Sequence, residues 1–168
     1  AAIMDNPPYW SFCWASGQVL AAHILTRPEL VSGKTVLDFG AGSGVVAIAA
    51  LMAGADRVIA CDVDSDARRA CAENARLNRV SLSLCNSLQE INAKVDVLFA
   101  ADVLYDLDNY GLLHRFADYA DEIIIADSRA KEVAPAVYRQ IGEREATTLP
   151  DYGEFDEFKR VKIYRSIS

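Results

Sequence analysis

Three glycines at alternating positions, Gly40, Gly42 and Gly44, follow the short apolar run Thr35–Phe39. They constrain the fold most, because a strand that leads through glycines into an apolar, helix-like segment (residues 44–52) is typical of a βα unit in a parallel sheet. Glycine lets the backbone pass close to a ligand and adopt positive φ. The following helix presents unpaired N–H groups and a partial positive charge. The turn can therefore hold a phosphate or a carboxylate.

Two acidic residues accompany this turn. Asp38 lies at the end of the first predicted strand, and Asp62 ends the second, Arg57–Cys61. A carboxylate after the second strand can accept hydrogen bonds from both ribose hydroxyls of an adenosyl group. The GxGxG spacing differs from the GxGxxG fingerprint of dinucleotide sites, which disfavours NAD. The pattern thus predicts an adenosyl ligand; the alternative is a tight structural turn beside a surface aspartate.

The rest of the chain alternates strand-like and helix-like segments. We expect further strands at residues 81–85, 95–100 and 122–126, and helices at residues 14–25, from Asp64 or Ser65 to about 78, at 108–119 and at 132–142. Two last runs, 144–149 and 158–166, read as an antiparallel hairpin. The pattern predicts an α/β fold: a Rossmann-like, doubly wound, mostly parallel seven-stranded sheet with a C-terminal antiparallel hairpin.

One domain over residues 1–168 fits this length, with residues 1–34 as a helical cover and 35–168 as the Rossmann-like core. We expect the opening helix to lie across the ends of the strands. The 52% hydrophobic composition is that of a globular protein.

Charge and cysteine usage exclude several classes of function. The net charge is −7 and the basic residues are scattered, so we expect no nucleic-acid partner. No apolar run approaches the roughly 20 residues that span a bilayer, and no secretory signal is seen, so we expect no membrane partner. The four cysteines form no CxxC pair and lack histidines at ligand spacing, which favours reduced thiols in a cytoplasmic protein without a metal site; they are Cys13, Cys61, Cys71 and Cys85.

The strand, glycine turn and two aspartates resemble the first two motifs of the seven-β-strand S-adenosylmethionine-dependent methyltransferases. Three segments are similar, more narrowly, to the group that includes the electron-transfer-flavoprotein β-subunit lysine methyltransferase and the N-terminal and lysine methylases. Residues 8–18 (PYWSFCWASGQ) resemble a YW…WPxG opening, with Ala15 where proline is common. Residues 101–106 (ADVLYD) resemble a D-x-x-Y segment, and residues 126–129 (ADSR) depart from a GDPxR segment at Ala126, Ser128 and in the spacing to Arg129.

This resemblance implies S-adenosylmethionine as the cofactor and assigns residues to it. Gly40 and Gly42 would pass close to the methionine part, with Gly44 completing the turn, and Asp38 would orient the turn or the cofactor ammonium. The remaining contacts would come from the following strand ends and the opening helix: Asp62 to the ribose hydroxyls, Val63 packing on adenine, Asn86 meeting the adenine edge and Trp14 covering the cofactor.

The same resemblance places the chemistry after the fourth strand. We expect Asp102 to orient an acceptor amine and Tyr105 to shape its pocket; the alternatives are a helix cap for Asp102 and plain packing for Tyr105. A sulfonium methyl is already electrophilic, so the protein needs only to hold a nucleophile in line with it. A lysine nucleophile must first lose a proton, because its ordinary pKa is about 10.4.

The leading hypothesis is an N-methyltransferase that acts on a protein lysine or a terminal amine. Two alternatives stay open: a methyltransferase of the same fold with a small-molecule acceptor, and a nucleotide-binding module without catalysis, of which an NAD oxidoreductase is a weaker variant. The sequence also leaves open the oligomeric state, and whether Arg129 or the acidic stretch 151–157 contacts substrate.

Overall fold

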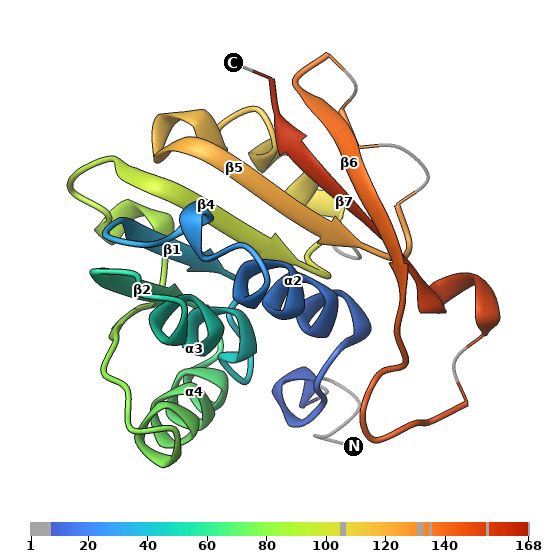
Figure 1. The fold of residues 1–168 in the computed structure, drawn as a ribbon, viewed down its shortest axis with the longest axis horizontal. Helices are drawn as coiled ribbons and strands as arrows, with labels where there is room; N and C mark the ends of the chain where they lie inside the picture. Colours follow the sequence, from blue (N-terminus) through green and yellow to red (C-terminus); the bar gives the residue numbers. More distant parts are fainter. Residues whose placement is uncertain (1–7, 105–106, 131–132, 135, 154, 168) are drawn as a thin grey trace.

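A seven-stranded mixed sheet forms the centre of the computed structural model, which describes residues 8–104, 107–130, 133–134, 136–153 and 155–167 (Figure 1). The strand order is β3-β2-β1-β4-β5-β7-β6. The first five strands run parallel, and β7 pairs antiparallel with both β5 and β6. The strands are β1 (Thr35–Phe39), β2 (Arg57–Cys61), β3 (Ser83–Cys85), β4 (Val95–Ala101), β5 (Ala120–Asp127), β6 (Tyr138–Glu145) and β7 (Arg160–Ser166). The predicted fold class is confirmed.

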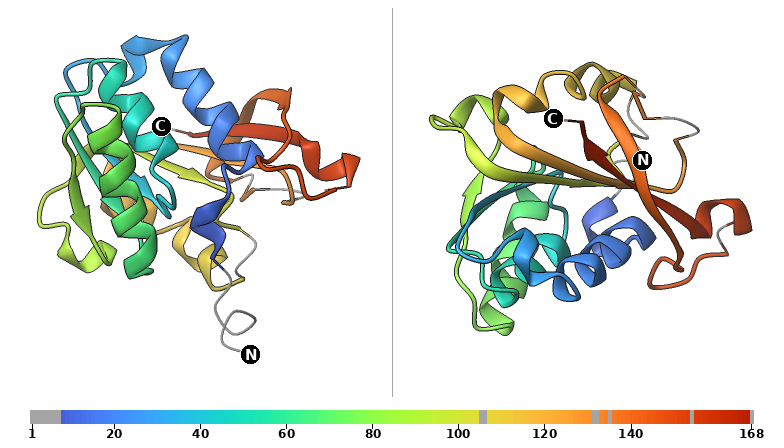
Figure 2. Two further views of the ribbon diagram at one scale, coloured as in Figure 1. Left: turned by 90° about the horizontal axis from the view of Figure 1, so that it is seen from below. Right: turned by 45° about the horizontal axis from the view of Figure 1, so that its top comes forward.

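Three α-helices lie together on one side of the sheet, below it in the right-hand view of Figure 2. They are α2 (Ala15–Leu25), α3 (Val45–Met52) and α4 (Ser65–Leu77). The other helices of the described residues are short 3-10 helices: η1 (Tyr9–Ser11), η2 (Pro28–Leu30), η3 (Leu88–Glu90), η4 (Leu107–Leu112), η5 (Phe116–Asp118) and η6 (Asp156–Lys159). Among the described residues, no helix has the length and apolar character needed to cross a bilayer.

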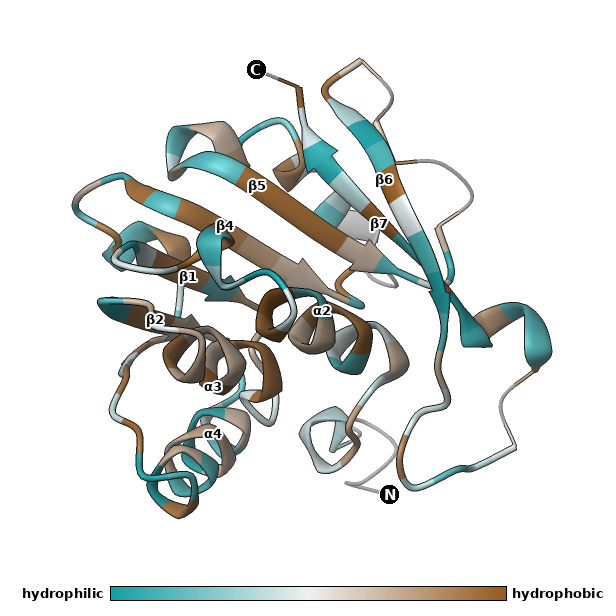
Figure 3. Ribbon diagram, in the orientation of Figure 1, coloured by the Kyte–Doolittle hydropathy of each residue, from teal (hydrophilic) through white to brown (hydrophobic). Residues whose placement is uncertain are grey.

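The central strands β4 and β5 consist largely of apolar residues, which are brown in Figure 3. Alternate residues of each strand point to opposite faces. In β4, Phe99 joins the core under the three α-helices, whereas its neighbour Leu98 joins a second core with Phe116 of η5. Parallel strands buried on both faces need this kind of double cover, and here one cover is α-helical and the other is built largely of 3-10 turns.

The position of the opening helix α2 differs from the prediction. It was expected across the ends of the strands, but it packs beside α3 and on the face of the sheet, with contacts to β4, β5, β6 and β7. Small residues permit the close approach to α3: a Cβ on Gly17 would lie 3.0 Å from Val45 Cγ1. The first turn of α2 reaches the carboxyl end of β4, where Ser16 contacts Asp102.

Two predicted helices are wrong. Residues 108–119 form the short 3-10 helices η4 and η5, with Gly111 inside η4, where glycine lowers helix propensity. The helix expected over 132–142 is contradicted by β6, which begins at Tyr138. The predicted pairing of the hairpin is confirmed, but its first strand begins six residues earlier than the expected 144.

Candidate functional site

The reversal of strand order lies between β1 and β4, which are neighbours although β2 and β3 follow β1 in the sequence. Connections from these two strands leave the sheet in opposite directions, so a crevice opens beyond their carboxyl ends, where open α/β sheets bind ligands. The glycine turn (residues 40–44) follows β1, and Asp102 directly follows β4. Two of the predicted site segments therefore meet at this crevice.

All three glycines of the turn have positive φ: +69° at Gly40, +51° at Gly42 and +86° at Gly44. Two of them are also packed too tightly for a side chain. A Cβ on Gly40 would lie 2.7 Å from Val103 Cγ1, and one on Gly44 would lie 2.6 Å from Cys71 Sγ. Above Gly42 there is open space for at least 4 Å. The turn thus presents bare backbone to the crevice at Gly42 and packs against the protein at its two ends.

Asp62 ties the end of β2 to the glycine turn. Its Oδ2 accepts a hydrogen bond from the Gly42 N–H at 2.8 Å, and its Oδ1 accepts one from the Asp64 N–H at 2.9 Å. The side chain of Arg68 donates to the Asp62 carbonyl oxygen at 2.6 Å. The carboxylate is therefore held in one orientation, and each oxygen keeps a further lone pair for a ligand.

Asp38 lies beneath the turn and not at its surface. It is buried, and its Oδ2 accepts a hydrogen bond from the Ala47 N–H at 3.0 Å. It thereby caps the first turn of α3, whose N-cap residue Gly44 has no side chain. Burial, with a smaller contribution from the Asp62 charge, raises the pKa of Asp38 to about 7. Asp38 thus contacts the start of the helix that follows the turn.

Most of the residues predicted to bind the cofactor line one cleft of about 450 Å³. The structure brings together in its wall Trp14, Gly40, Gly42, Asp62, Val63, Asn86 and Asp102. Val63 is 85% exposed, so its side chain is available to a flat ligand. Asp38 and Gly44 are buried behind this wall, and Tyr105 lies outside the described residues.

Asp102 takes part in a contact that the sequence did not predict. Its carboxylate accepts hydrogen bonds from the Ser16 N–H at 3.1 Å and from the Ser16 hydroxyl at 2.5 Å. It therefore caps helix α2, and among the described residues it makes no hydrogen bond to the segment that directly follows it. Its backbone has φ +51°, a strained value for a residue with a side chain. Burial raises the pKa of Asp102 to about 6, and the Ser16 hydroxyl partly opposes that rise.

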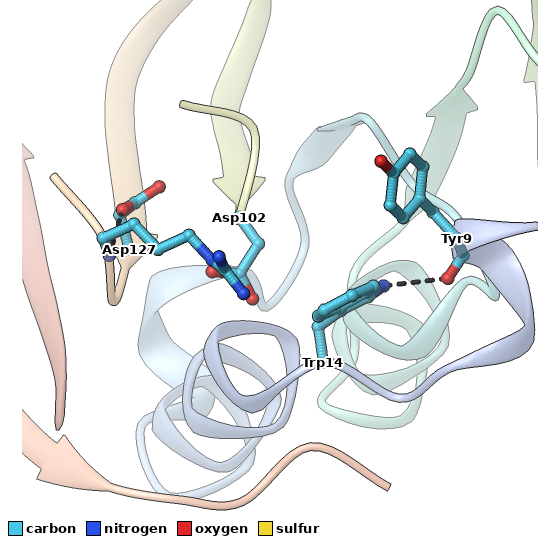
Figure 4. A pocket seen from close by; sticks show the side chains of 5 residues that line it. Tyr9, Trp14, Asp102 and Asp127 are labelled. Atoms are coloured by element: carbon cyan, nitrogen blue, oxygen red, sulfur yellow. Dashed lines mark hydrogen bonds between the residues drawn. The ribbon is translucent and has the colours of Figure 1, made fainter. Parts of the chain in front are cut away.

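A second, smaller cavity of about 130 Å³ adjoins the cleft (Figure 4). Its lining residues are Tyr9, Trp14, Asp102, Asp127 and Arg129, so Tyr9, Trp14 and Asp102 border both spaces. Asp127 ends β5, next to β4 in the sheet. Asp127 was not among the predicted site residues; its place at a strand end, like those of Asp38 and Asp62, is the signal that would have identified it.

The aromatic side of this cavity comes from the opening segment. The Trp14 indole N–H donates to the Tyr9 carbonyl oxygen at 2.8 Å, and both side chains face the cavity (Figure 4). Backbone hydrogen bonds between Cys13 and Leu149 attach this segment to the connection between β6 and β7. In the described part of the chain, no group of His, Cys, Asp and Glu side chains is arranged to hold a metal ion.

This arrangement agrees with comparisons to known proteins. The sequence model of the ribosomal protein L11 methyltransferase (PrmA) family matches residues 22–114, which span the glycine turn, Asp62 and Asp102. The chain belongs to this methyltransferase family. Among its relatives, the human electron transfer flavoprotein beta subunit lysine methyltransferase is 38% identical over 130 residues, which are 73% of this chain and 50% of the human protein. The chain thus spans about half the length of that relative.

Solved structures of other methyltransferases share the fold. The ribosomal protein L11 methylase of Lactobacillus delbrueckii has a TM-score of 0.68 and 23% identity, and covers 89% of this chain and 77% of its own. The N-methyltransferase NodS of Bradyrhizobium japonicum was solved with S-adenosyl-L-homocysteine. It has a TM-score of 0.66 and 16% identity, and the match covers 98% of this chain and 89% of NodS.

Proposed function

We propose that this chain transfers a methyl group from S-adenosylmethionine to an amine, and that the acceptor is a lysine side chain or terminal amine of a protein. One observation carries the proposal. The large cleft beside the glycine turn and the small acidic cavity meet at Trp14 and Asp102. A methyl donor in the first space and an amine in the second would face each other across that junction.

The residues of the cleft fit the proposed cofactor. Open space above Gly42 admits a chain that runs along the backbone, and the fixed carboxylate of Asp62 has lone pairs for two ribose hydroxyls. The exposed side chain of Val63 offers a surface for adenine, and Asn86, also in the cleft wall, offers hydrogen-bonding groups to its edge. S-adenosylmethionine, when bound, supplies an electrophilic methyl group on sulfur.

The chain's own residues would position the acceptor. Asp102 accepts a hydrogen bond from the amine and so directs the nitrogen lone pair toward the cleft, while Trp14 excludes water from the junction. The amine loses its proton to solvent before the transfer. Its nitrogen then forms the new N–C bond as the C–S bond breaks, and the bonding electron pair stays on sulfur. Alignment of this kind lowers the barrier without a covalent enzyme intermediate.

The relatives support a protein acceptor over a small molecule. The human relative is named for a lysine in a protein subunit, and the matched family for a ribosomal protein. Transfer of a labelled methyl group from S-adenosylmethionine into a cell lysate, followed by gel fractionation, tests the proposal. Label in protein bands that is released as methyl-lysine or a methylated terminal amine is expected. Label confined to the low-mass fraction would reject the protein acceptor, and no label at all would reject the transfer.

A further inference from the structure

We propose that Asp127 binds the cationic group of the methyl acceptor, within the small cavity that it shares with Asp102. This inference rests on the proposed function, since it concerns the acceptor of the same reaction. It adds a specificity-determining residue: Asp127 would favour acceptors that carry a positive charge.

The hydrogen bonds of Asp127 leave one of its oxygens available. The residue is 1% exposed, and Oδ1 accepts hydrogen bonds from the backbone N–H groups of Arg129 at 2.8 Å and Ala130 at 2.7 Å. Among the described residues, Oδ2 has no hydrogen bond or ion pair, although Asp127 lines the cavity. Oδ2 is therefore the oxygen that Asp127 can offer to a ligand in the cavity, and a cation there would pair with its negative charge.

Asp102 differs from Asp127 in this respect. Both of its oxygens are already engaged by Ser16, and Oδ1 lies 3.5 Å from the Ser128 hydroxyl. The two carboxylates come from the ends of adjacent parallel strands and border one space. Asp102 therefore faces the junction with the cleft while holding α2 in place, and Asp127 is the carboxylate that keeps one oxygen without a hydrogen bond to the described residues.

The opposite wall suits a cation as well. Trp14 and Tyr9 contribute aromatic rings, and aromatic faces attract ammonium groups, most strongly where water is excluded. In Figure 4, Asp102 and Asp127 lie on one side of the cavity and Trp14 and Tyr9 on the other. An alkylammonium would thus meet carboxylates at its N–H groups and an aromatic surface along its methylenes.

One positive residue, Arg129, also lines the cavity. Its Nη2 donates to the Tyr152 hydroxyl at 3.2 Å, the guanidinium lies 4.6 Å from the centre of the Phe158 ring, and its charge also helps to lower the pKa of Asp102. The two carboxylates outnumber this single guanidinium, so the cavity keeps its preference for a cation.

Binding of butylammonium, which has the shape and charge of a lysine side-chain end, tests the inference without requiring turnover. The chain has only two tryptophans, so the indole N–H signal of Trp14 is readily assigned in a ¹H–¹⁵N spectrum. With the protein saturated in S-adenosylhomocysteine, butylammonium should shift that signal in a saturable way, and neutral 1-butanol should bind at least tenfold more weakly. A stronger response to 4-aminobutyrate than to butylammonium would overturn the inference, because it would show an anion contact.

Asp127→Asn is the decisive variant, because its amide oxygen can still accept the two backbone N–H groups while the charge is lost. We expect at least tenfold weaker butylammonium binding, with S-adenosylhomocysteine affinity unchanged. Asp118→Asn, at an exposed position of η5, is the matched control and should bind like the parent. Equal binding by Asp127→Asn and the parent would refute the role of Asp127. Absence of methyl transfer would count against the proposed function and leave this binding test intact; should the variant not fold, the comparison of butylammonium with 1-butanol decides.

Discussion

The carboxylate of Asp102 caps helix α2 through Ser16, a residue 86 positions earlier in the chain. The N-cap residue of α2, Trp14, makes no side-chain cap, so the first turn of the helix takes its acceptor from the end of β4. This contact connects α2, which covers the site, to Asp102 at the carboxyl end of β4. A change in Asp102 would move the opening helix, and a change in Ser16 would alter the proposed acceptor-orienting carboxylate.

Ser16→Ala tests this connection. Loss of the hydroxyl removes a hydrogen bond that stabilises the ionised form of Asp102, so the pKa of that carboxyl should rise above about 6. If methyl transfer needs the carboxylate, the acidic limb of the pH–rate profile should move to higher pH, with a smaller effect at pH 9. Ser83→Ala, on an exposed position of β3, should leave the profile unchanged. An unshifted acidic limb in the Ser16 variant would argue against Asp102 as the titrating group.

Asp38 should make stability depend on pH. Its folded pKa of about 7 lies above its ordinary value of 3.8, so between these pH values the folded state binds more protons than the unfolded state. The contribution of Asp38 therefore decreases as pH rises from about 4 to 7. Asp38→Asn keeps an acceptor for the Ala47 N–H without the buried charge. Relative to the parent, it should gain up to about 4 kcal/mol in unfolding free energy between pH 4 and pH 8.

Chemical denaturation of the cofactor-free protein at several pH values measures this difference. Asp96→Asn, an exposed position on β4, provides a comparison that removes one negative charge from the surface. A constant difference between parent and Asp38→Asn across this pH range would contradict the raised pKa.

Alanine substitutions at Gly40 and Gly33 distinguish the cost of backbone strain from the cost of a steric clash. Both have φ of +69°, but a Cβ at Gly33 meets nothing within 4 Å, whereas one at Gly40 meets Val103. Alanine at either position should cost about 1 to 2 kcal/mol from the left-handed backbone. Gly40→Ala should lose more stability than Gly33→Ala and should also weaken S-adenosylhomocysteine binding. Thermal unfolding and calorimetry of both variants measure the two effects; equal losses would remove the argument for close packing of the turn.

Trp14 is predicted to contribute to both spaces. Trp14→Phe keeps an aromatic ring but removes the indole N–H that bonds to the Tyr9 carbonyl oxygen. Without this hydrogen bond, the aromatic ring at position 14 should be held less firmly in the cavity wall. The KM for the acceptor should therefore rise several-fold. Tyr119→Phe, which also removes one polar hydrogen from an aromatic residue, serves as the control. Steady-state kinetics with acceptor varied at saturating cofactor would show a rise confined to the Trp14 variant; no rise would contradict its place in the acceptor wall.

The part of the fold from β1 to α4 could be predicted from sequence because local signals agree there. Buried strands are continuous apolar runs, Asp64 caps α4 through the Asp66 N–H as expected, and Gly54 follows the end of α3. The error at residues 132–142 has a physical cause. Strand β6 lies at the sheet edge with most of its residues exposed, so it lacks the apolar alternation by which strands are recognised.

Most of the candidate site could be predicted because its residues follow strands in a known order; Trp14, on the opening segment, was predicted from the family resemblance instead. Asp62, Asn86 and Asp102 directly follow parallel strands, and Val63 comes one residue later; the carboxyl ends of these strands meet at one edge. The partner of Asp102 could not be predicted, because nothing local in the sequence joins Ser16 to a residue 86 positions away. For the same reason, the division of the site into a cleft and a separate acidic cavity became visible only in three dimensions.

The most direct test of the account is calorimetric titration of S-adenosylhomocysteine and its 2′-deoxyribose analogue into the parent and Asp62→Ala. The parent should bind S-adenosylhomocysteine, should not bind NAD, and should bind the deoxy analogue at least tenfold more weakly. In Asp62→Ala, affinity for S-adenosylhomocysteine should fall to about that for the analogue, while Asp66→Ala should match the parent. Equal affinity of parent and Asp62→Ala for S-adenosylhomocysteine, or binding of NAD in its place, would contradict the adenosyl site.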